Sequence, residues 1–339
     1  MAEAETVRAH GPGRVNLIGE HTDYNAGLAL PFAIERGVTV TAEPLEGDRI
    51  EAHALDLGEH DAFALDDDPR AIGWRAFVRG TVAELRAAGH AIRPSRLEIE
   101  GDLPHGSGLS SSAALEAALC LALLEDPDVD RVELAKLCSR VENEHVGART
   151  GLLDQLAVLC GRDGAALRID FRDLAIEPVP LELGDWRLVT LDSGAGHEHA
   201  GGGYNERRAE CAAACEVLGI ESLRDATSAD GLPAPLDRRV RHVLSENVRV
   251  DAMTAALAAG DLERAGRLLR ESHASLRDDY ETSVPEVERT VEALERAGSA
   301  GARMVGGGFG GSVLALFPPG ATPPDGSVSV APGPAARRL

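Results

Sequence analysis

Apolar and polar positions recur along the chain with two different periods, and together these predict a mixture of helices and strands. Spacings of three and four residues, or long apolar runs, predict helices at 74–88, 112–124, 131–146, 151–160, 203–218, 236–259, 261–277 and 284–297. Alternation in twos and short β-branched runs predict strands at 36–43, 96–100, 164–171, 186–192 and 312–317. We therefore expect an α+β fold.

The length of the chain indicates more than one domain. It has 339 residues, whereas a single domain usually holds about 100–200. The pattern breaks at Glu177-Pro178-Val179-Pro180, so we expect an N-terminal domain over 1–178 and a C-terminal domain over 179–339. The Pro- and Gly-rich stretch after Pro318 is expected to form a poorly ordered surface segment.

The charge of the chain argues against one class of partner. There are 34 Lys and Arg against 56 Asp and Glu, a formal net charge of −22. A nucleic-acid-binding surface needs clustered cations, so we expect no nucleic-acid partner. No apolar stretch approaches the roughly 20 residues that span a bilayer. With an acidic N-terminus and an odd number of cysteines without a CxxC pair, the sequence favours a cytoplasmic enzyme with reduced thiols and no membrane partner. A monomer is the expected oligomeric state, although no motif in the sequence determines it.

A Gly- and Ser-rich segment over 103–112, between a predicted strand and a predicted helix, is a candidate for binding phosphate. Glycines let the backbone approach an anion, and the N-terminus of the following helix presents free N–H groups and the positive end of its dipole. The segment lacks the Gly-Lys-Ser/Thr of a Walker A loop, and a capped helix after a flexible turn would show the same pattern. The candidate phosphate-binding residues are Gly106, Ser107, Gly108, Leu109, Ser110, Ser111 and Ser112.

Two further segments point to a polar ligand. Residues 13–25 place Arg14, Glu20, His21 and Asp23 around a short apolar strand, and such a density of directional hydrogen-bonding groups suits a hydroxyl-rich ligand. Residues 306–311 contain five glycines in six positions before a predicted buried strand, which suits a close approach of the backbone to a ligand or to another segment.

These three segments, in this order along the chain, resemble the motifs of the GHMP kinases (galacto-, homoserine, mevalonate and phosphomevalonate kinases). Residues 13–25 are similar to the signature of the galactokinase branch, and so are residues 204–208 and 272–280. The resemblance implies a two-domain GHMP kinase fold, with a left-handed βαβ unit in the N-terminal domain and a ferredoxin-like C-terminal domain. The activity implied is ATP-dependent phosphorylation of galactose at the C1 hydroxyl.

The resemblance also implies catalytic roles. Asp154 corresponds to the catalytic carboxylate, and whether it is a general base or an electrostatic anchor stays open. Arg14 would keep Asp154 ionised and stabilise charge on the transferring phosphate.

The binding roles implied fall into three groups. Sugar contacts would come from Glu20, His21, Asp23, Gly151 and Tyr204. ATP would contact the Ser-rich segment and Trp74. Mg²⁺ would be held by Ser112 and Glu142, a hydroxyl and a carboxylate that suit its preference for oxygen ligands.

Two other functions stay open on the sequence. A kinase of the same branch could act on N-acetylgalactosamine, galacturonate or arabinose, although residues 20–23 supply no cation for a carboxylate at C6 unless His21 is protonated. A galactose-sensing regulator would bind sugar and ATP without turnover, and the intact Ser-rich segment together with Asp154 speaks against it.

Two local alternatives stay open as well. Trp74 and Phe77 could serve as core aromatics rather than as an adenine pocket. His197, Glu198 and His199 could bind a transition metal, although two histidines and one carboxylate are a sparse ligand set.

Overall fold

A computed structural model describes residues 5–103, 108–195 and 200–339. The N-terminal part is built on a six-stranded sheet in the order β13-β1-β3-β6-β4-β5. Neighbouring strands are antiparallel except β4 and β6, which are parallel and are joined through β5 and a helix. The strands are β1 (Val7–Asn16), β3 (Pro31–Pro44), β4 (Arg49–Ala54), β5 (Glu59–Ala64), β6 (Ser95–Gly101) and β13 (Arg337–Arg338).

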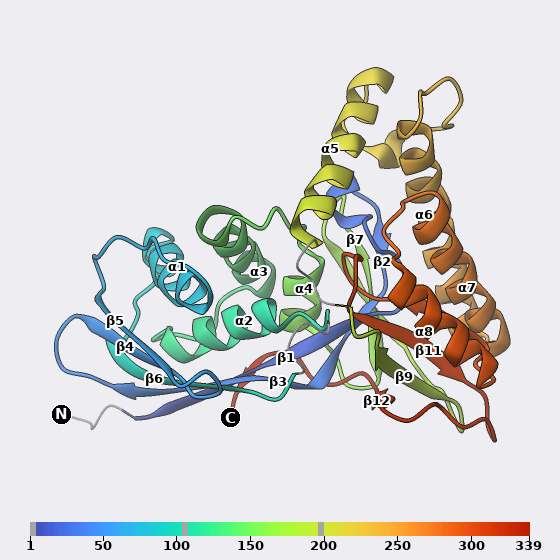
Figure 1. Cartoon of the computed structure of the whole chain (residues 1–339). Coiled ribbons are helices and arrows are strands. Elements are labelled where there is room, and N and C mark those ends of the chain that lie inside the picture. The colour runs from blue at the N-terminus through green and yellow to red at the C-terminus, as the bar shows by residue number, and fades with distance from the viewer. Residues whose placement is uncertain (1–4, 104–107, 196–199) are drawn as a thin grey trace.

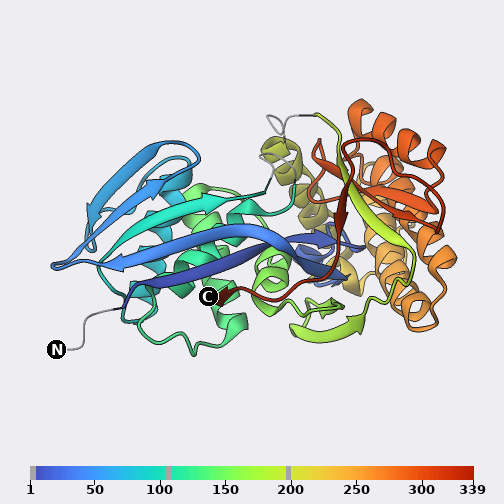
Figure 2. The same cartoon turned by 90° about the horizontal axis from the view of Figure 1, so that it is seen from below.

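Helices cover one face of this sheet (Figure 1), while the opposite face in Figure 2 shows its strands uncovered by helices. The helices are α1 (Trp74–Ala87), α2 (Ser111–Leu123), α3 (Arg131–Arg140) and α4 (Leu153–Cys160). The helix expected over 131–146 changes character after Arg140, because Val141–Val146 form a π-helical turn. This turn carries Glu142, whose carboxylate accepts hydrogen bonds from Thr150 and from Gln155 on α4.

Helix α2 is the centre of the first core. Its sequence is apolar all round, which is typical of a buried helix, and residues 113–123 are all buried. It packs closely on β1, since a Cβ on Gly11 would lie 1.9 Å from the carbonyl oxygen of Ala114. This close packing holds the N-terminus of α2, which begins after Ser110, beside β1.

The C-terminal part is built on a four-stranded antiparallel sheet in the order β10-β11-β9-β12, and a second hydrophobic core lies between this sheet and its helices. A three-stranded sheet in the order β2-β7-β8 stands between the two parts. The strands are β2 (Leu28–Ala29), β7 (Ala165–Asp170), β8 (Ala175–Pro180), β9 (Arg187–Asp192), β10 (Gly301–Met304), β11 (Ser312–Phe317) and β12 (Val328–Val330). The helices are α5 (Ala200–Leu218), α6 (Leu236–Ala258), α7 (Leu262–Asp278) and α8 (Pro285–Arg296).

The structure confirms the α+β class and corrects two local expectations. Residues 177–180 do not interrupt the structure, because they lie in β8 and pair with β7. The stretch after Pro318 is ordered: it forms β12 and β13, and Ala336 is buried, with its N–H donating to the carbonyl of Val158 at 2.9 Å. The last strand returns to β1, and the division at 178/179 stays a prediction. No helix in the described part of the chain is long and apolar enough to cross a membrane.

Candidate active site

One cavity of about 400 Å³ collects most of the predicted catalytic and sugar-binding residues. It lies where the end of β1, the loop before α4, the start of α5 and the Gly-rich turn between β10 and β11 converge. Of the residues predicted from the sequence, its lining contains Arg14, Glu20, His21, Asp23, Gly151, Asp154 and Tyr204. The N-terminal motif and the loop of Asp154, far apart in sequence, are therefore brought to one place.

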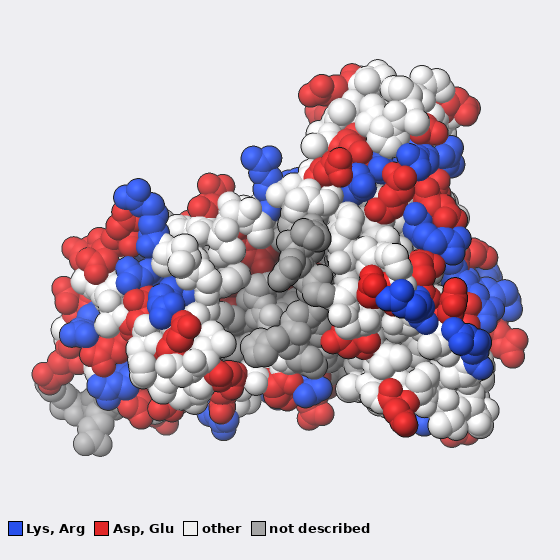
Figure 3. Space-filling model, in the orientation of Figure 1, with Lys and Arg blue, Asp and Glu red and all other residues white. Residues whose placement is uncertain are grey.

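Charged side chains of both signs are intermingled over the face drawn in Figure 3. On this face, the acidic side chains do not gather into one patch without basic ones. An anionic ligand has to be held by particular cations and N–H groups inside the cavity.

Asp154 is fixed by a bidentate ion pair at the floor of the cavity. Arg14 donates to it through Nε at 2.8 Å and through Nη2 at 2.9 Å, and the Ser110 hydroxyl also donates to Oδ2. The third nitrogen of Arg14, Nη1, donates to the carbonyl of Gly108 at 2.5 Å. One guanidinium therefore joins the Asp154 carboxylate to the Gly- and Ser-rich segment, a geometry that Lys could not reproduce.

Glu20 is buried and receives donors from the C-terminal sheet. The N–H of Gly306 donates to its Oε1 at 2.8 Å, and Nη2 of Arg303 lies 3.4 Å from the same oxygen. Burial raises the pKa of Glu20, and Arg303 and Arg14 oppose that rise. A buried carboxylate is therefore held between the two parts of the molecule.

His21 stands in an aromatic stack. Its Nδ1 is 2.8 Å from the hydroxyl of Tyr24, and its ring centroid lies 4.6 Å from that of Tyr280 and 5.3 Å from that of Tyr204. Burial, with a contribution from His242, lowers the pKa of His21 to about 3, so the imidazole is neutral near pH 7. Its buried Nε2 has no partner among the described residues, and such an atom in a cavity is suited to a ligand hydroxyl.

Asp23 and Gly151 are in close contact. A Cβ on Gly151 would lie 1.7 Å from Oδ2 of Asp23, so only glycine fits the present position of this carboxylate. The N–H of Leu153 approaches the same oxygen at 3.4 Å. Burial raises the pKa of Asp23 to about 6, and the negative charge of Asp154 adds to the rise. Asp23 is therefore a carboxylate near pH 7 that becomes neutral in mild acid.

Glu142 and Ser112 meet at the N-terminal end of α2. The Oε2 atom of Glu142 accepts from Thr150 Oγ1 at 2.5 Å and from Gln155 Nε2 at 3.0 Å, and its Oε1 accepts neither bond. Burial raises its pKa, and the Ser112 hydroxyl beside it opposes the rise. One oriented carboxylate and one hydroxyl fit a Mg²⁺ ion that takes its other ligands from nucleotide phosphates and water. Among the described residues, no three His, Cys, Asp or Glu gather where they could hold a metal.

Some predicted residues do not line this cavity. The indole N–H of Trp74 donates to Glu59 on β5 at 2.8 Å, and Phe77 packs on the first core. Leu109 is a buried core residue. Gly106 and Ser107 lie outside the described residues, as do His197, Glu198 and His199 with the metal-site alternative.

Several polar residues around the cavity escape sequence reasoning. Glu116 is fully buried in α2 within 3.5 Å of Gln155, and burial raises its pKa well above the usual value. Arg303 and Glu246 are also fully buried. The sequence signal that could have identified these residues is a single charge inside an otherwise apolar helix or strand, since such charges are rarely buried without a role or a partner.

Three family comparisons match separate parts of the chain. Residues 2–44 match the galactokinase galactose-binding signature, residues 76–162 the N-terminal domain of GHMP kinases, and residues 253–325 the C-terminal domain of GHMP kinases. The first match contains Arg14, Glu20, His21 and Asp23, the residues that line one wall of the cavity.

Curated relatives resemble nearly the whole chain. A galactokinase of Mycobacterium bovis is 46% identical over 325 residues, which cover 92% of this chain and 89% of the relative. A galactokinase of Streptomyces coelicolor is 41% identical over 332 residues, which cover 93% of this chain and 85% of the relative.

Solved structures show the same fold. Lactococcus lactis galactokinase complexed with galactose superposes with a TM-score of 0.90 at 33% identity, covering 99% of this chain and 96% of that one. A mevalonate kinase of Methanococcus jannaschii, at 19% identity and a TM-score of 0.69, covers 94% of this chain and 92% of that one and shows the fold alone. With the site geometry, these matches establish that the chain belongs to the galactokinase family of the GHMP kinases.

Proposed function

We propose that this chain transfers the γ-phosphoryl group of ATP to the C1 hydroxyl of galactose, giving galactose 1-phosphate and ADP. The observation that carries the proposal is the bidentate Arg14–Asp154 pair at the floor of a cavity whose wall holds Glu20, His21 and Asp23. The pair suits phosphoryl transfer and the wall suits a polyhydroxylated ring. The galactose bound to the L. lactis relative supports the choice of sugar.

The wall of the cavity offers both kinds of hydrogen-bonding partner to the sugar. Glu20 and Asp23 supply carboxylate acceptors, and the unpartnered Nε2 of the neutral His21 can donate or accept according to its tautomer. Tyr204 presents its ring beside His21. A neutral, hydroxyl-rich ligand satisfies these groups without bringing a charge of its own.

The floor of the cavity aligns the reacting groups. The C1 oxygen attacks the γ-phosphorus, the bond to the β-phosphate oxygen breaks, and the hydroxyl proton is released toward Asp154. Because three donors from Arg14 and Ser110 already engage the two oxygens of Asp154, we assign this residue mainly the role of a fixed anion that orients the hydroxyl and stabilises its departing proton. Arg14 in turn lies close to the phosphate-binding segment and offsets negative charge there.

Nucleotide and metal binding belong to the same proposal. The Ser-rich segment at the start of α2, from Gly108 to Ser112, is proposed to bind the phosphates, and Trp74 to contact the nucleotide from α1. Ser112 and Glu142 would hold Mg²⁺, which neutralises phosphate charge when bound. We also propose that the enzyme acts as a monomer in the cytoplasm, and light scattering at assay concentration would test the monomer.

The test is ADP release by the purified protein with Mg²⁺-ATP and galactose, glucose, N-acetylgalactosamine, galacturonate or arabinose. Turnover with galactose is expected to exceed that with the other sugars. Galacturonate is the most informative alternative substrate, because the exposed Arg149 lines the cavity and could pair with a carboxylate at C6. Binding of galactose without ADP release would instead favour a sensor, and turnover of another sugar alone would replace the substrate but not the mechanism.

A further inference from the structure

Arg303, near the end of β10, is a buried cation that the proposed mechanism does not use. Its side chain is 0% exposed. It reaches out of the C-terminal sheet into the N-terminal part, where Nη1 donates to the carbonyls of Asn16 at 2.8 Å and Leu17 at 3.3 Å. These carbonyls lie at and just beyond the end of β1, immediately before the residues that line the sugar wall.

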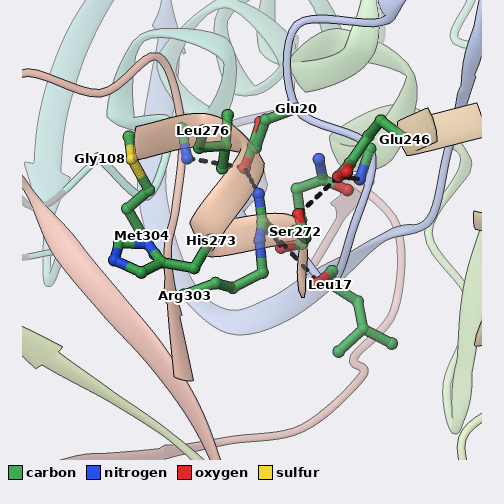
Figure 4. A network of polar contacts seen from close by, with 12 residues as sticks. Leu17, Glu20, Gly108, Glu246, Ser272, His273, Leu276, Arg303 and Met304 are labelled. Atoms are coloured by element: carbon green, nitrogen blue, oxygen red, sulfur yellow. Dashed lines mark hydrogen bonds and ion pairs between the residues drawn. The ribbon is translucent and has the colours of Figure 1, made fainter. Parts of the chain in front are cut away.

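The rest of the guanidinium faces Glu20. Nη2 lies 3.4 Å from Oε1 of Glu20, and neither Nε nor Nη2 forms a hydrogen bond within the described residues. Figure 4 shows the guanidinium between Glu20 and the backbone at Leu17. A fully buried guanidinium with N–H groups that form no hydrogen bond lowers the stability of the fold unless its charge balances a nearby carboxylate.

The neighbouring buried carboxylate, Glu246 on α6, has closer partners than this cation. It accepts from the Gly19 N–H at 3.0 Å and from Ser272 Oγ at 2.6 Å, and it pairs with Arg249 at 2.7 Å. Figure 4 shows Glu246 and Ser272 as a separate group beside Arg303. Arg249 is therefore the nearer cation to Glu246, whose pKa Arg303 lowers by a smaller contribution, whereas Arg303 makes the largest contribution of any charge to lowering the pKa of Glu20.

We propose that Arg303 is a positioning residue for sugar binding: it holds the Glu20 carboxylate ionised and turned to the cavity, although it does not itself line the cavity. The inference rests on the proposed function and adds a residue from the opposite sheet to it. Without the cation, the buried charge of Glu20 would be left with the Gly306 N–H, the side chain of Asn16 and the more distant Arg14, which is already paired with Asp154. The carboxylate would then become neutral or turn away, and the sugar would lose an acceptor.

The effect is expected on the sugar and not on the nucleotide. Arg303 forms no hydrogen bond or ion pair with the Ser-rich segment or with Asp154 in the described residues. Calorimetry of galactose binding without nucleotide should therefore show the Kd of Arg303→Met raised by at least about 30-fold. The KM for ATP should stay within about threefold of the wild-type value. Arg303→Lys keeps the charge but not the planar guanidinium, so its galactose Kd should lie between those of the wild type and Arg303→Met.

A double-mutant cycle separates positioning from general damage. Glu20→Gln removes the charge that Arg303 balances, so Arg303→Met in the Glu20→Gln background should change the galactose Kd by less than about threefold. The double variant also removes the buried unpaired carboxylate, so it should be more stable to heat than Arg303→Met alone, which keeps the test usable if the single variant folds poorly.

Arg239 supplies the matched control. It is 1% exposed and pairs with Glu210 and Glu281 outside the cavity lining. Arg239→Lys should lower the melting temperature without changing the galactose Kd. The inference would be overturned if Arg303→Met kept the wild-type galactose Kd or lost galactose and ATP binding equally. It would also be overturned if Arg303→Met changed the galactose Kd equally with and without Glu20→Gln, or if Arg239→Lys changed that Kd as much as Arg303→Met does. If the wild type bound no galactose, the proposed function would fail first and the inference with it.

Discussion

The two halves of the cavity are built in different ways. The sugar half is made of side chains that both parts of the molecule hold in place: the buried Glu20 and His21 and the partly exposed Asp23 and Tyr204. The proposed phosphate half depends on a helix N-terminus, backbone groups and one ion pair. Arg14 and Asp154 line the cavity, and Asp154 is 26% exposed, whereas Gly108, Ser110, Ser112 and Glu142 lie outside its lining.

The sugar half is fixed from behind by a polar layer. His242 on α6 lies with Nε2 3.1 Å from the carbonyl of Glu20, Asn247 accepts from the N–H of Leu28 at 2.8 Å, and Glu246 accepts from Gly19. These contacts cross from α6 to the loop after β1, so the sugar wall cannot move without breaking buried hydrogen bonds.

The difference between the halves follows from what each ligand needs. A neutral sugar is distinguished from its isomers only by the direction of its hydroxyls, so its partners must be rigid, buried and satisfied on every other side. Phosphate groups carry charge that any nearby N–H, cation or metal stabilises, so a helix terminus with a few ligands is sufficient. We therefore expect substitutions in one half to leave binding in the other half nearly intact.

The largest expected effect comes from Asp154→Asn. The amide keeps the shape but loses the anion, so turnover should fall by at least about 10³-fold. Galactose binding, measured by calorimetry, should stay within about threefold of the wild type because the sugar half is unchanged. Asp163→Asn, at an exposed position, is the control and should turn over normally. A loss of galactose binding in Asp154→Asn would show that the halves are not separable.

A second variant breaks the phosphate half at its metal site. Glu142→Ala removes a buried carboxylate, whereas Glu144→Ala changes an exposed one two positions away. Glu142→Ala should raise the Mg²⁺ concentration for half-maximal rate by about 30-fold, and Glu144→Ala should not. Mn²⁺ binding to the enzyme–ATP complex, followed by electron paramagnetic resonance, gives a readout that does not depend on turnover. Equal behaviour of the two variants would remove Glu142 from the metal site.

The pH dependence of sugar binding sharpens the comparison. Because the pKa of Asp23 is raised to about 6, its ionised fraction falls about tenfold between pH 7 and pH 5. Galactose affinity without nucleotide should fall by a similar factor as the pH is lowered, since the lost carboxylate was an acceptor. His21, with its pKa lowered to about 3, stays neutral throughout this window. Asp23→Asn should bind more weakly but lose this dependence, and an unchanged profile in that variant would exclude Asp23 as its cause.

The smallest expected effect comes from Gly151→Ala. The added Cβ would lie 1.7 Å from Oδ2 of Asp23, so the loop and the carboxylate must move apart. We expect the KM for galactose to rise about fivefold and the KM for ATP to stay unchanged. Gly202→Ala, where a Cβ would meet nothing within 4 Å, is the control. A larger change in the KM for ATP than in the KM for galactose would assign Gly151 to the phosphate half instead of the sugar half.

Sequence reasoning found all eight α-helices that the described residues form, because their apolar positions recur with a helical period or, in α2, run on without a break. The helix predicted at 74–88 and the strand predicted at 312–317 agree with α1 and β11 within one residue. It missed β4 and β5, and it read β8 as an interruption, because these strands carry many charged or proline residues and are held by pairing with neighbours. Strands that are held by hydrogen bonds to their neighbours and carry few apolar residues show little apolar alternation to detect.

The residues of the candidate site also divide into those that the sequence predicts and those that it does not. Arg14, Glu20, His21 and Asp23 could be predicted because they cluster within one short segment. Arg303 and Glu116 could not, since each is one charge in an apolar stretch, and only the fold shows which carboxylate or amide it faces.

The central claim is that this cavity phosphorylates galactose at C1, and product analysis by nuclear magnetic resonance tests it most directly. Wild-type protein with Mg²⁺-ATP and galactose should give a sugar phosphate whose ³¹P signal couples to the proton on C1, and Asp154→Asn under the same conditions should give none. Phosphate at another carbon, or no sugar phosphate from the wild type, would contradict the account.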